Sequence, residues 1–261
     1  MESDPFNTSN RLITLSDVIS IFSQLKIDYQ PKDIHFYRKS FIHESYRKLK
    51  CYESYKNTIG ALELQDESYE RLEFIGDALI ESIVANYLYD RYHIIYNQDE
   101  GFLTKLKTRL VCGKNLTFLS SQLDFQKHIV ISKTIEEKYK GRDNMKDHKI
   151  LCDVFEAFCG AIYQDSRDYE LVRRFVISVI ETYVDMLDLI IHDTNYKDQL
   201  SRYIKKTYFQ YPTYTTDVIE SKHKTTVWNG DSCIGTYECE NKKESQQQAA
   251  RLGLIYYGLL N

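Results

Sequence analysis

Residues 70–81 read ERLEFIGDALIE, and this short run holds four acids at helical spacing: Glu70, Glu73, Asp77 and Glu81. At about 100° per residue these acids fall within an arc of roughly 80°, while the apolar residues of the run project from the opposite side. Like charges at this spacing each cost a few tenths of a kcal/mol or so, and the acidic face carries no Lys or Arg to offset them. The pattern predicts a helix with a buried side and an acidic side that needs a cation.

Composition places the chain among globular proteins. It has 261 residues, of which 43% are hydrophobic, so it can bury one or two cores. A disordered or collagen-like class is excluded. The sequence shows neither a run of eighteen apolar residues nor the charge and apolar pattern of a secretory signal at MESDPFNTSN. We expect an intracellular protein of the cytoplasm or nucleus, not secreted and with no membrane partner.

Cysteine usage and charge narrow the class further. The six cysteines form no C-x-x-C pair and no zinc-type cluster, which predicts reduced thiols. The net charge is −4, but it is unevenly spread. Residues 195–261 hold nine Lys and Arg against seven Asp and Glu, and residues 1–194 hold 25 against 31. An acidic first part and a mildly basic tail predict two different roles.

The hydrophobic periodicity predicts a mostly helical chain with a small mixed tail. Residues 1–13 are expected to be a flexible N-terminus, and residues 45–67 a connection with little structure of its own. A domain boundary is predicted near 191–195. Helices are predicted near 16–26, 32–43, 68–92, 99–110, 113–123, 147–164 and 168–191. The tail then predicts a helix, three short strands with a turn at Asn229-Gly230, and a last helix.

Two further segments carry acids that match the first run. Glu100 opens EGFLTKLKTRLV, while Asp153 and Glu156 lie three residues apart in ILCDVFEAFCGAIY. Carboxylates in a buried helix are costly unless they are paired or bind metal. Ligands that are all oxygen favour Mg²⁺ or Mn²⁺, ions that suit phosphoryl chemistry. The alternative is that each carboxylate simply faces solvent, as single charged residues usually do.

A di-iron helical bundle is a rival metal interpretation. It requires Glu-x-x-His on each of two helices. The one such spacing here, Glu220 to His223, lies in the strand-rich tail, so this interpretation is set aside.

These blocks together resemble the ribonuclease III family. ERLEFIGDALI, EGFLTKLKTRLV and GRDNMKDHKILCDVFEAFCGAIYQD are similar to its acidic segments, in a form closest to eukaryotic members, and FIHESY at 41–46 is similar to the short segment before them. The resemblance covers about residues 14–190. It implies an all-helical endonuclease domain over 14–191.

The resemblance also implies roles for individual residues. Glu73, Asp77, Asp153 and Glu156 match the positions that bind the catalytic metal, Mg²⁺ with Mn²⁺ as a substitute. Glu70 and Glu100 match further acidic positions of the cleavage site. Phe74 matches an aromatic that inserts into a partner subunit, whereas an ordinary core phenylalanine is the alternative. Glu81 matches nothing in the family and is expected to be solvated.

The tail over 195–261 resembles a double-stranded-RNA-binding domain, with the order α-β-β-β-α. Lys242 and Lys243 match the basic start of its last helix, where two ammonium groups and free N–H groups predict a phosphate site. His223 matches a position that either contacts RNA or caps a loop. Departures from the family pattern are Arg202, where a Glu is usual, and Ser221-Lys222, where Gly-Pro is usual.

The expected function is therefore cleavage of double-stranded RNA by two-metal-ion phosphodiester hydrolysis, in RNA processing or silencing-related degradation. A homodimer is expected because one set of acids serves one strand, while a duplex has two strands and two-fold symmetry. The alternative is a non-catalytic double-stranded-RNA-binding protein that keeps the fold. A suppressor of RNA silencing and a housekeeping processor would share the same chemistry, so the sequence leaves both open.

Overall fold

The computed structural model describes residues 4–145, 149–191 and 195–260. Its chain separates into two compact units, residues 1–189 and 190–261. The boundary predicted near 191–195 includes residues 192–194, which lie outside the described part, and it stays a prediction. Within the described ranges, no helix is both long and apolar enough to span a bilayer.

The first unit is all-helical, as predicted. Its helices are α1 (Leu15–Gln24), α2 (Ile34–Lys39), α3 (Glu70–Leu88), α4 (Glu100–Leu110), α5 (Gly113–Gln122), α6 (Lys133–Lys138), α7 (Lys149–Ser166), α8 (Tyr169–Tyr183) and α9 (Met186–Ile191). Short turns of 3₁₀ helix are η1 (Glu44–Tyr46), η2 (Lys50–Tyr52), η4 (Phe125–Lys127) and η5 (Arg142–Met145), and η3 (Tyr89–Ile94) is a π-helical extension of α3. The first residues of the predicted helix 147–164 lie outside the described part.

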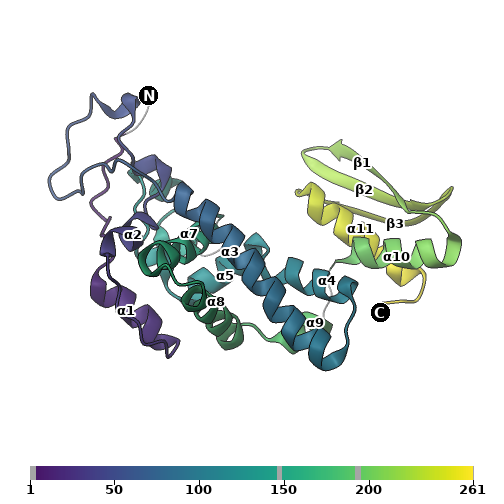
Figure 1. Ribbon diagram of the computed structural model, residues 1–261. Helices are drawn as coiled ribbons and strands as arrows, with labels where there is room; N and C mark the ends of the chain where they lie inside the picture. Colours follow the sequence, from purple (N-terminus) through teal and green to yellow (C-terminus); the bar gives the residue numbers. More distant parts are fainter. Residues whose placement is uncertain (1–3, 146–148, 192–194, 261) are drawn as a thin grey trace. The chain divides into compact units, whose positions relative to one another are not determined.

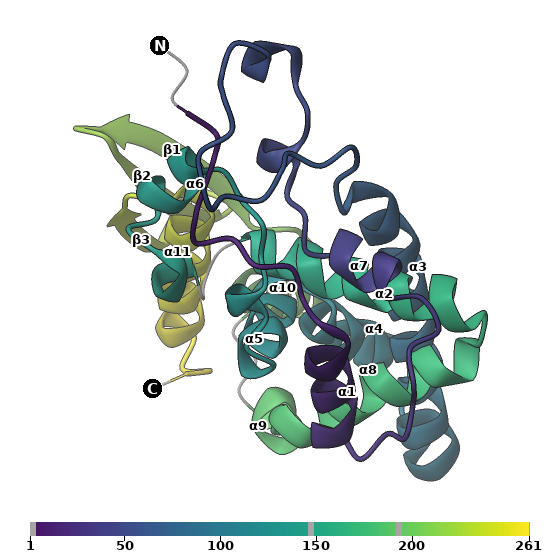
Figure 2. The ribbon, with the colours of Figure 1, turned by 90° about the vertical axis from the view of Figure 1, so that its left-hand side faces the viewer.

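Helix α7 is the centre of this unit. Thirteen of its eighteen residues are buried, because apolar residues occupy most of its circumference. It packs against α2, α3, α5 and α8 (Figures 1 and 2). Six phenylalanines contact one another around it at edge-on and tilted angles: Phe22, Phe41, Phe125, Phe155, Phe158 and Phe175.

The long helix predicted over 168–191 is two helices. Val184 is extended, which ends α8. Asp185 then accepts hydrogen bonds from the backbone N–H groups of Leu187 and Asp188, at 2.9 and 3.0 Å, and so caps α9. A capping aspartate inside an apolar pattern starts a new helix, which the periodicity alone does not reveal.

Residues 4–13 of the N-terminal segment have side chains packed within the first unit, and the flexibility expected of residues 1–13 stays a prediction. Phe6 and Ile13 are buried. Asn7 and Asn10 each donate a side-chain hydrogen bond to the backbone carbonyl of Ile131, at 3.2 and 2.9 Å. Paired amide side chains can hold a polar segment as firmly as an apolar stripe does, and such pairing leaves no periodic signal.

Residues 45–67 form the connection with little secondary structure that was predicted. They contain η2 and the end of η1, and Figure 2 shows most of the segment as a long loop. An isolated bridge joins Arg47 to Gln65. Leu62 and Leu64 pack on a small cluster that includes Tyr46, so the ends of the loop are anchored.

The second unit has the predicted order α-β-β-β-α. Its elements are α10 (Tyr196–Tyr208), β1 (Thr213–Ile219), β2 (Lys222–Asn229), β3 (Ser232–Cys239) and α11 (Lys242–Tyr256). The strands form an antiparallel sheet in the order β1-β2-β3. Both helices lie on one face of this sheet (Figure 1).

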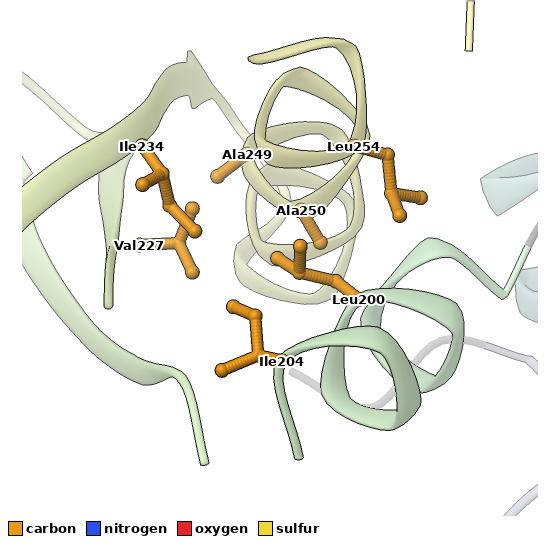
Figure 3. Packing of buried hydrophobic residues seen from close by; sticks show 7 residues of the cluster. All are labelled: Leu200, Ile204, Val227, Ile234, Ala249, Ala250 and Leu254. Atoms are coloured by element: carbon orange, nitrogen blue, oxygen red, sulfur yellow. The ribbon is translucent and has the colours of Figure 1, made fainter. Parts of the chain in front are cut away.

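The core of the second unit lies between the sheet and its helices. Figure 3 shows seven side chains pointing toward one another there: Leu200, Ile204, Val227, Ile234, Ala249, Ala250 and Leu254. Gly235 lets β3 approach α11 closely, because a Cβ at this position would lie 2.5 Å from the carbonyl oxygen of Ala249. The two-residue turn between β1 and β2 is Glu220-Ser221, and both residues have positive φ, as a tight hairpin of this length requires.

Candidate active site

Two helices bring four of the predicted acids together. Glu73 and Asp77 come from α3, and Asp153 and Glu156 come from the start of α7. All four line one open pocket of about 470 Å³, whose other lining residues are Glu70, Phe74, Lys149 and Cys152. Among these lining residues, Lys149 is the one that carries a positive charge. The pocket therefore has a strong excess of negative charge.

Glycines let α3 and α7 approach to backbone contact. A Cβ on Gly76 would lie 1.7 Å from the carbonyl oxygen of Glu156, and a Cβ on Gly160 would lie 2.1 Å from the carbonyl oxygen of Leu72. Any side chain at either position would force the helices apart. Gly76 lies next to Asp77, and Gly160 follows Glu156 by one turn. The close contact is thus what places the acids of one helix beside those of the other.

Burial and like charge perturb two of these acids. Burial, with the nearby Asp77 carboxylate, raises the pKa of Glu156 to about 7. Burial and the charge of Asp153 likewise raise the pKa of Glu73. Burial is the larger cause of both pKa shifts, and the neighbouring carboxylates add to it. A carboxyl set of this kind gains stability when a cation binds.

Asp153 is the acid that the chain itself supports. It is 8% exposed. Lys149 Nζ donates to one carboxylate oxygen at 2.9 Å, and the Tyr69 hydroxyl donates to the other at 3.3 Å. Lys149 stands four residues before Asp153, so the pair spans one turn of α7. Neither Tyr69 nor Lys149 was identified from the sequence; the i, i+4 spacing of Lys149 was the available signal.

Glu70 lies at the edge of the same pocket, where it begins α3. It accepts a hydrogen bond from the Ser68 hydroxyl at 2.9 Å. Its carboxylate also shares a hydrogen bond with Glu44, which raises the pKa of Glu44 and lowers the pKa of Glu70. Glu44, in the FIHESY segment, is an acid that the sequence analysis did not single out.

Glu100 does not join the other acids within this chain. It opens α4, is exposed, and accepts a hydrogen bond from the Thr104 hydroxyl at 2.8 Å. It does not line the acidic pocket. The expectation that Glu81 is solvated is wrong in part, because its half-exposed carboxylate forms an ion pair with Lys107 on α4 at 2.5 Å. The acidic face of α3 therefore ends at Asp77.

The donor set fits a hard divalent ion. Four carboxylates from two rigid helices offer oxygen ligands, as Mg²⁺ and Mn²⁺ prefer. The ligand oxygens of Asp153 and Glu156 lie within 4.8 Å of each other, in a group that also includes the sulfur of Cys152.

Comparison with known proteins now identifies the family. The family model for the ribonuclease III domain matches residues 70–167, and that for the double-stranded RNA binding motif matches residues 196–257. A protein of Zunongwangia profunda named ribonuclease 3 is 31% identical over 240 residues, which cover 90% of this chain and 88% of that protein. The chain belongs to the ribonuclease III family.

Two further likenesses are to a viral protein and to a solved nuclease domain. A probable ribonuclease 3 of Acanthamoeba polyphaga mimivirus is 31% identical over 236 residues, which cover 87% of this chain but 39% of that longer protein. The nuclease domain of ribonuclease III from Campylobacter jejuni is 26% identical, with a TM-score of 0.49, and the match covers 64% of this chain and 98% of that one. The two family models show that this ribonuclease III family member carries a nuclease domain followed by a double-stranded-RNA-binding motif.

Phe74 lies at the rim of the acidic pocket in this ribonuclease III. It is 80% exposed, so the interpretation as an ordinary core phenylalanine is wrong for the single chain. Leu72 and Gly76, on either side of it, are buried. A phenylalanine displayed on an acidic face loses the burial energy that its ring would gain, about 1.5–3 kcal/mol. This loss favours an interface role.

The RNA-binding motif shows the predicted lysines and one correction. Lys242 and Lys243 are exposed in the first turn of α11. The Asn241 side chain already accepts from the N–H groups of Lys243 and Glu244, at 2.9 and 3.2 Å. The sequence predicted that these N–H groups are free, and the structure shows that Asn241 occupies them. A phosphate here would therefore be held mainly by the two ammonium groups.

His223 and Arg202 complete the predicted RNA-binding motif. His223 lies in β2, opposite Val218 and Cys239, and its Nδ1 is buried with no hydrogen-bond partner among the described residues. It thus belongs to a strand instead of capping a loop. Arg202, which replaces the Glu usual in the family, forms an ion pair with Asp198 at 2.9 Å on the exposed side of α10.

Proposed function

We propose that this ribonuclease III hydrolyses phosphodiester bonds in double-stranded RNA with two Mg²⁺ ions, for which Mn²⁺ can substitute. The observation that carries the proposal is the set of Glu73, Asp77, Asp153 and Glu156 in one pocket, with Lys149 as the one cation lining it. These four residues would hold the metal. Bound Mg²⁺ supplies Lewis acidity to the reacting phosphate and a pathway to ionise water near neutral pH.

The chain's own groups prepare this site. Backbone contact at Gly76 and Gly160 fixes the spacing between the two pairs of acids. Lys149 and Tyr69 hold the Asp153 carboxylate in one orientation through its two oxygens. Burial keeps Glu156 partly out of water, which strengthens its attraction for a cation. Glu70 sits at the mouth of the pocket, and we assign Glu70 and Glu100 to the further acidic positions of the cleavage site.

We assign duplex binding to the second unit. A-form RNA is recognised through shape, phosphates and 2′-hydroxyls, so sequence preference should be weak. Lys242 and Lys243 supply phosphate contacts at the start of α11, and His223 is a candidate contact from β2. Salt-dependent affinity should therefore come mainly from residues 195–261.

The alternative is a non-catalytic RNA-binding protein with this fold. The uncompensated acids argue against it, because clustered carboxylates cost stability and bring nothing to a protein that only binds an anionic duplex. Whether the enzyme acts in RNA processing or in silencing-related degradation is decided by its RNA. Sequencing the RNAs retained in cells by a Glu156→Ala protein would identify that class.

Substitution of Glu156 tests the metal site. Glu156→Ala should lower the cleavage rate by about 10³-fold, equal to about 4 kcal/mol of transition-state stabilisation, while duplex affinity stays near the wild-type value. Gel assays of a labelled duplex with Mg²⁺ measure the rate, and filter binding without metal measures the affinity. Glu81→Ala is the matched control, since Glu81 lies on the same helix as Glu73 but pairs with Lys107 outside the pocket. A Glu156→Ala protein that cuts at the wild-type rate would contradict the metal assignment.

Substitution of Phe74 tests the proposed homodimer. Two copies would supply two sets of acids for the two strands of a duplex, and the exposed Phe74 ring is the proposed anchor. Phe74→Asp should give a folded monomer with little double-strand cleavage, measured by light scattering and gel assay. A heterodimer with one Glu156→Ala subunit should nick one strand. A wild-type monomer at micromolar concentration that cuts both strands in one encounter would overturn the dimer.

A further inference from the structure

A cysteine thiol adjoins the acids in the pocket. Cys152 lies in α7, one residue before Asp153 and one turn before Glu156, and it is 7% exposed. Its Sγ lies 3.5 Å from Glu156 Oε1 and donates to it. The thiol and the two carboxylates have their ligand atoms within 4.8 Å of one another. One helix thus presents a sulfur ligand and two oxygen ligands at a single point.

This donor set is not matched to Mg²⁺ alone. Magnesium takes oxygen ligands and does not use a thiolate, whereas Zn²⁺ and Cd²⁺ bind sulfur together with carboxylate oxygen. A thiophilic ion would therefore gain a ligand that magnesium leaves unused. Asp153 and Glu156 would serve both kinds of ion, so the two could not be bound there together.

An ion can reach the thiol from two sides. Cys152 lines the acidic pocket and also a neighbouring open pocket of about 530 Å³, whose other lining residues are Gly113, Lys114, Thr117 and Lys149. The excess negative charge of the acidic pocket attracts any divalent cation. Cys152 is 7% exposed, and it lines both pockets.

We propose that a divalent cation of the zinc class binds Cys152, Asp153 and Glu156 and inhibits this enzyme by displacing magnesium from the last two residues. Binding releases the thiol proton to solvent and forms a metal–sulfur bond, without any change of oxidation state. The inhibition rests on the proposed function, because it assumes that Asp153 and Glu156 hold Mg²⁺. The site itself does not depend on that assumption.

Cadmium provides a direct probe of the sulfur ligand. Metal-free wild-type protein titrated with CdCl₂ should show a tight component of sulfur-to-cadmium charge-transfer absorption and a rise in melting temperature. Cys152→Ser should lose that component and weaken cadmium binding by about tenfold or more. Cys112→Ser is the matched control, since Cys112 is an exposed thiol next to Gly113 of the neighbouring pocket. It should keep the tight component.

Competition between metal ions completes the test. Excess MgCl₂ should reduce the charge-transfer band of the wild type, and ZnCl₂ should abolish it. The zinc concentration that halves cleavage should be about tenfold higher in Cys152→Ser than in the wild type, with each rate taken relative to the same protein without zinc. Retention of the tight component in Cys152→Ser, or in Cys152→Ala if the serine variant misfolds by circular dichroism, overturns the site. If magnesium cannot reduce the charge-transfer band of the wild type, the proposal that the two kinds of ion share Asp153 and Glu156 is overturned. Absence of Mg²⁺-dependent cleavage in the wild type would overturn the proposed function. The cadmium titration would still test the Cys152 site, because it does not depend on cleavage.

Discussion

The two ends of α7 each bury an aspartate, but the charges around the two aspartates differ. Near the C-terminal end, Asp165 is 7% exposed and accepts four donors: the Tyr29 and Tyr37 hydroxyls at 2.6 and 3.1 Å, and the backbone N–H groups of Lys32 and Asp33 at 3.0 and 2.7 Å. At the N-terminal end, Asp153 accepts from Lys149 and Tyr69. It shares one pocket with Glu156 and with the acids of α3, and Lys149 is the one lining residue of that pocket with a positive charge.

This contrast separates a structural acid from a functional one. A carboxylate that accepts several hydrogen bonds stabilises the folded state, because each charge-assisted bond replaces hydration at little cost. Carboxylates that face one another destabilise it until a cation arrives. Burial is similar at both ends of α7, so burial alone does not mark the site. The balance of donors and like charges does.

Neutralising Asp165, near the C-terminal end of α7, should have the largest effect on the free energy of unfolding. Asp165→Asn would place an amide NH₂ against hydroxyl and backbone donors, leaving at least one of them unpaired. We expect the free energy of unfolding to fall by about 2–4 kcal/mol in urea titrations. Glu81→Gln, at a half-exposed ion pair, should change it by less than about 1 kcal/mol. Equal changes in the two variants would contradict the anchoring role of Asp165.

Neutralising Glu156, near the N-terminal end of α7, should instead raise the free energy of unfolding of the metal-free protein. In EDTA the folded protein holds Glu156 with a pKa of about 7 against an ordinary value of 4.5. The folded state therefore binds more protons between these values, and its stability falls as pH rises through that window. Glu156→Gln should stabilise the metal-free protein at pH 8 by on the order of 1–2 kcal/mol, after allowance for solvent access at the pocket.

Thermal melts at several pH values measure this difference. Wild-type protein in EDTA should lose stability from about pH 5 to pH 8, and the Glu156→Gln curve should be flatter over the same range. Addition of Mg²⁺ should raise the melting temperature of the wild type more than that of the variant. If Glu156→Gln is less stable than the wild type without metal, the pocket is not undercompensated and the contrast along α7 fails.

Local patterns allowed much of this to be predicted, and distant partners explain what was missed. The acids of α3 and α7 follow from helical spacing, and the hairpin between β2 and β3 follows from Asn229-Gly230. The role of Asp165 depends on donors more than a hundred residues away. No periodicity reports such pairing. The hydrogen bonds of Asn7 and Asn10 to the carbonyl of Ile131 also join residues more than a hundred positions apart, so no local pattern reports them.

Residues whose effect depends on a neighbour's side chain also escaped prediction. The Asn241 cap, which occupies two N–H groups of α11, follows a common N-cap preference that could have been read from Asn-Lys-Lys-Glu. The Phe74 ring could not be placed from sequence, because a phenylalanine beside an acidic face fits either a core or an interface. Its exposure in the structure resolves that choice for the single chain.

Lys242 and Lys243 extend the comparison to charged residues that do not lower the stability of the protein without RNA. Lys242 and Lys243 are exposed, and the first turn of α11 is already capped by Asn241. Replacing both with Ala should therefore change the free energy of unfolding by less than about 0.5 kcal/mol. The slope of log affinity against log salt should fall by about two phosphate contacts' worth in binding titrations with a duplex.

Lys205→Ala with Lys206→Ala, a second adjacent pair in the last turn of α10, is the matched control. If phosphates are bound at the start of α11, the control pair should change the slope by less than one contact. An equal change from both pairs would mean that the unit attracts RNA through its general charge, and an unchanged slope in the first variant would remove Lys242 and Lys243 from the RNA-binding surface.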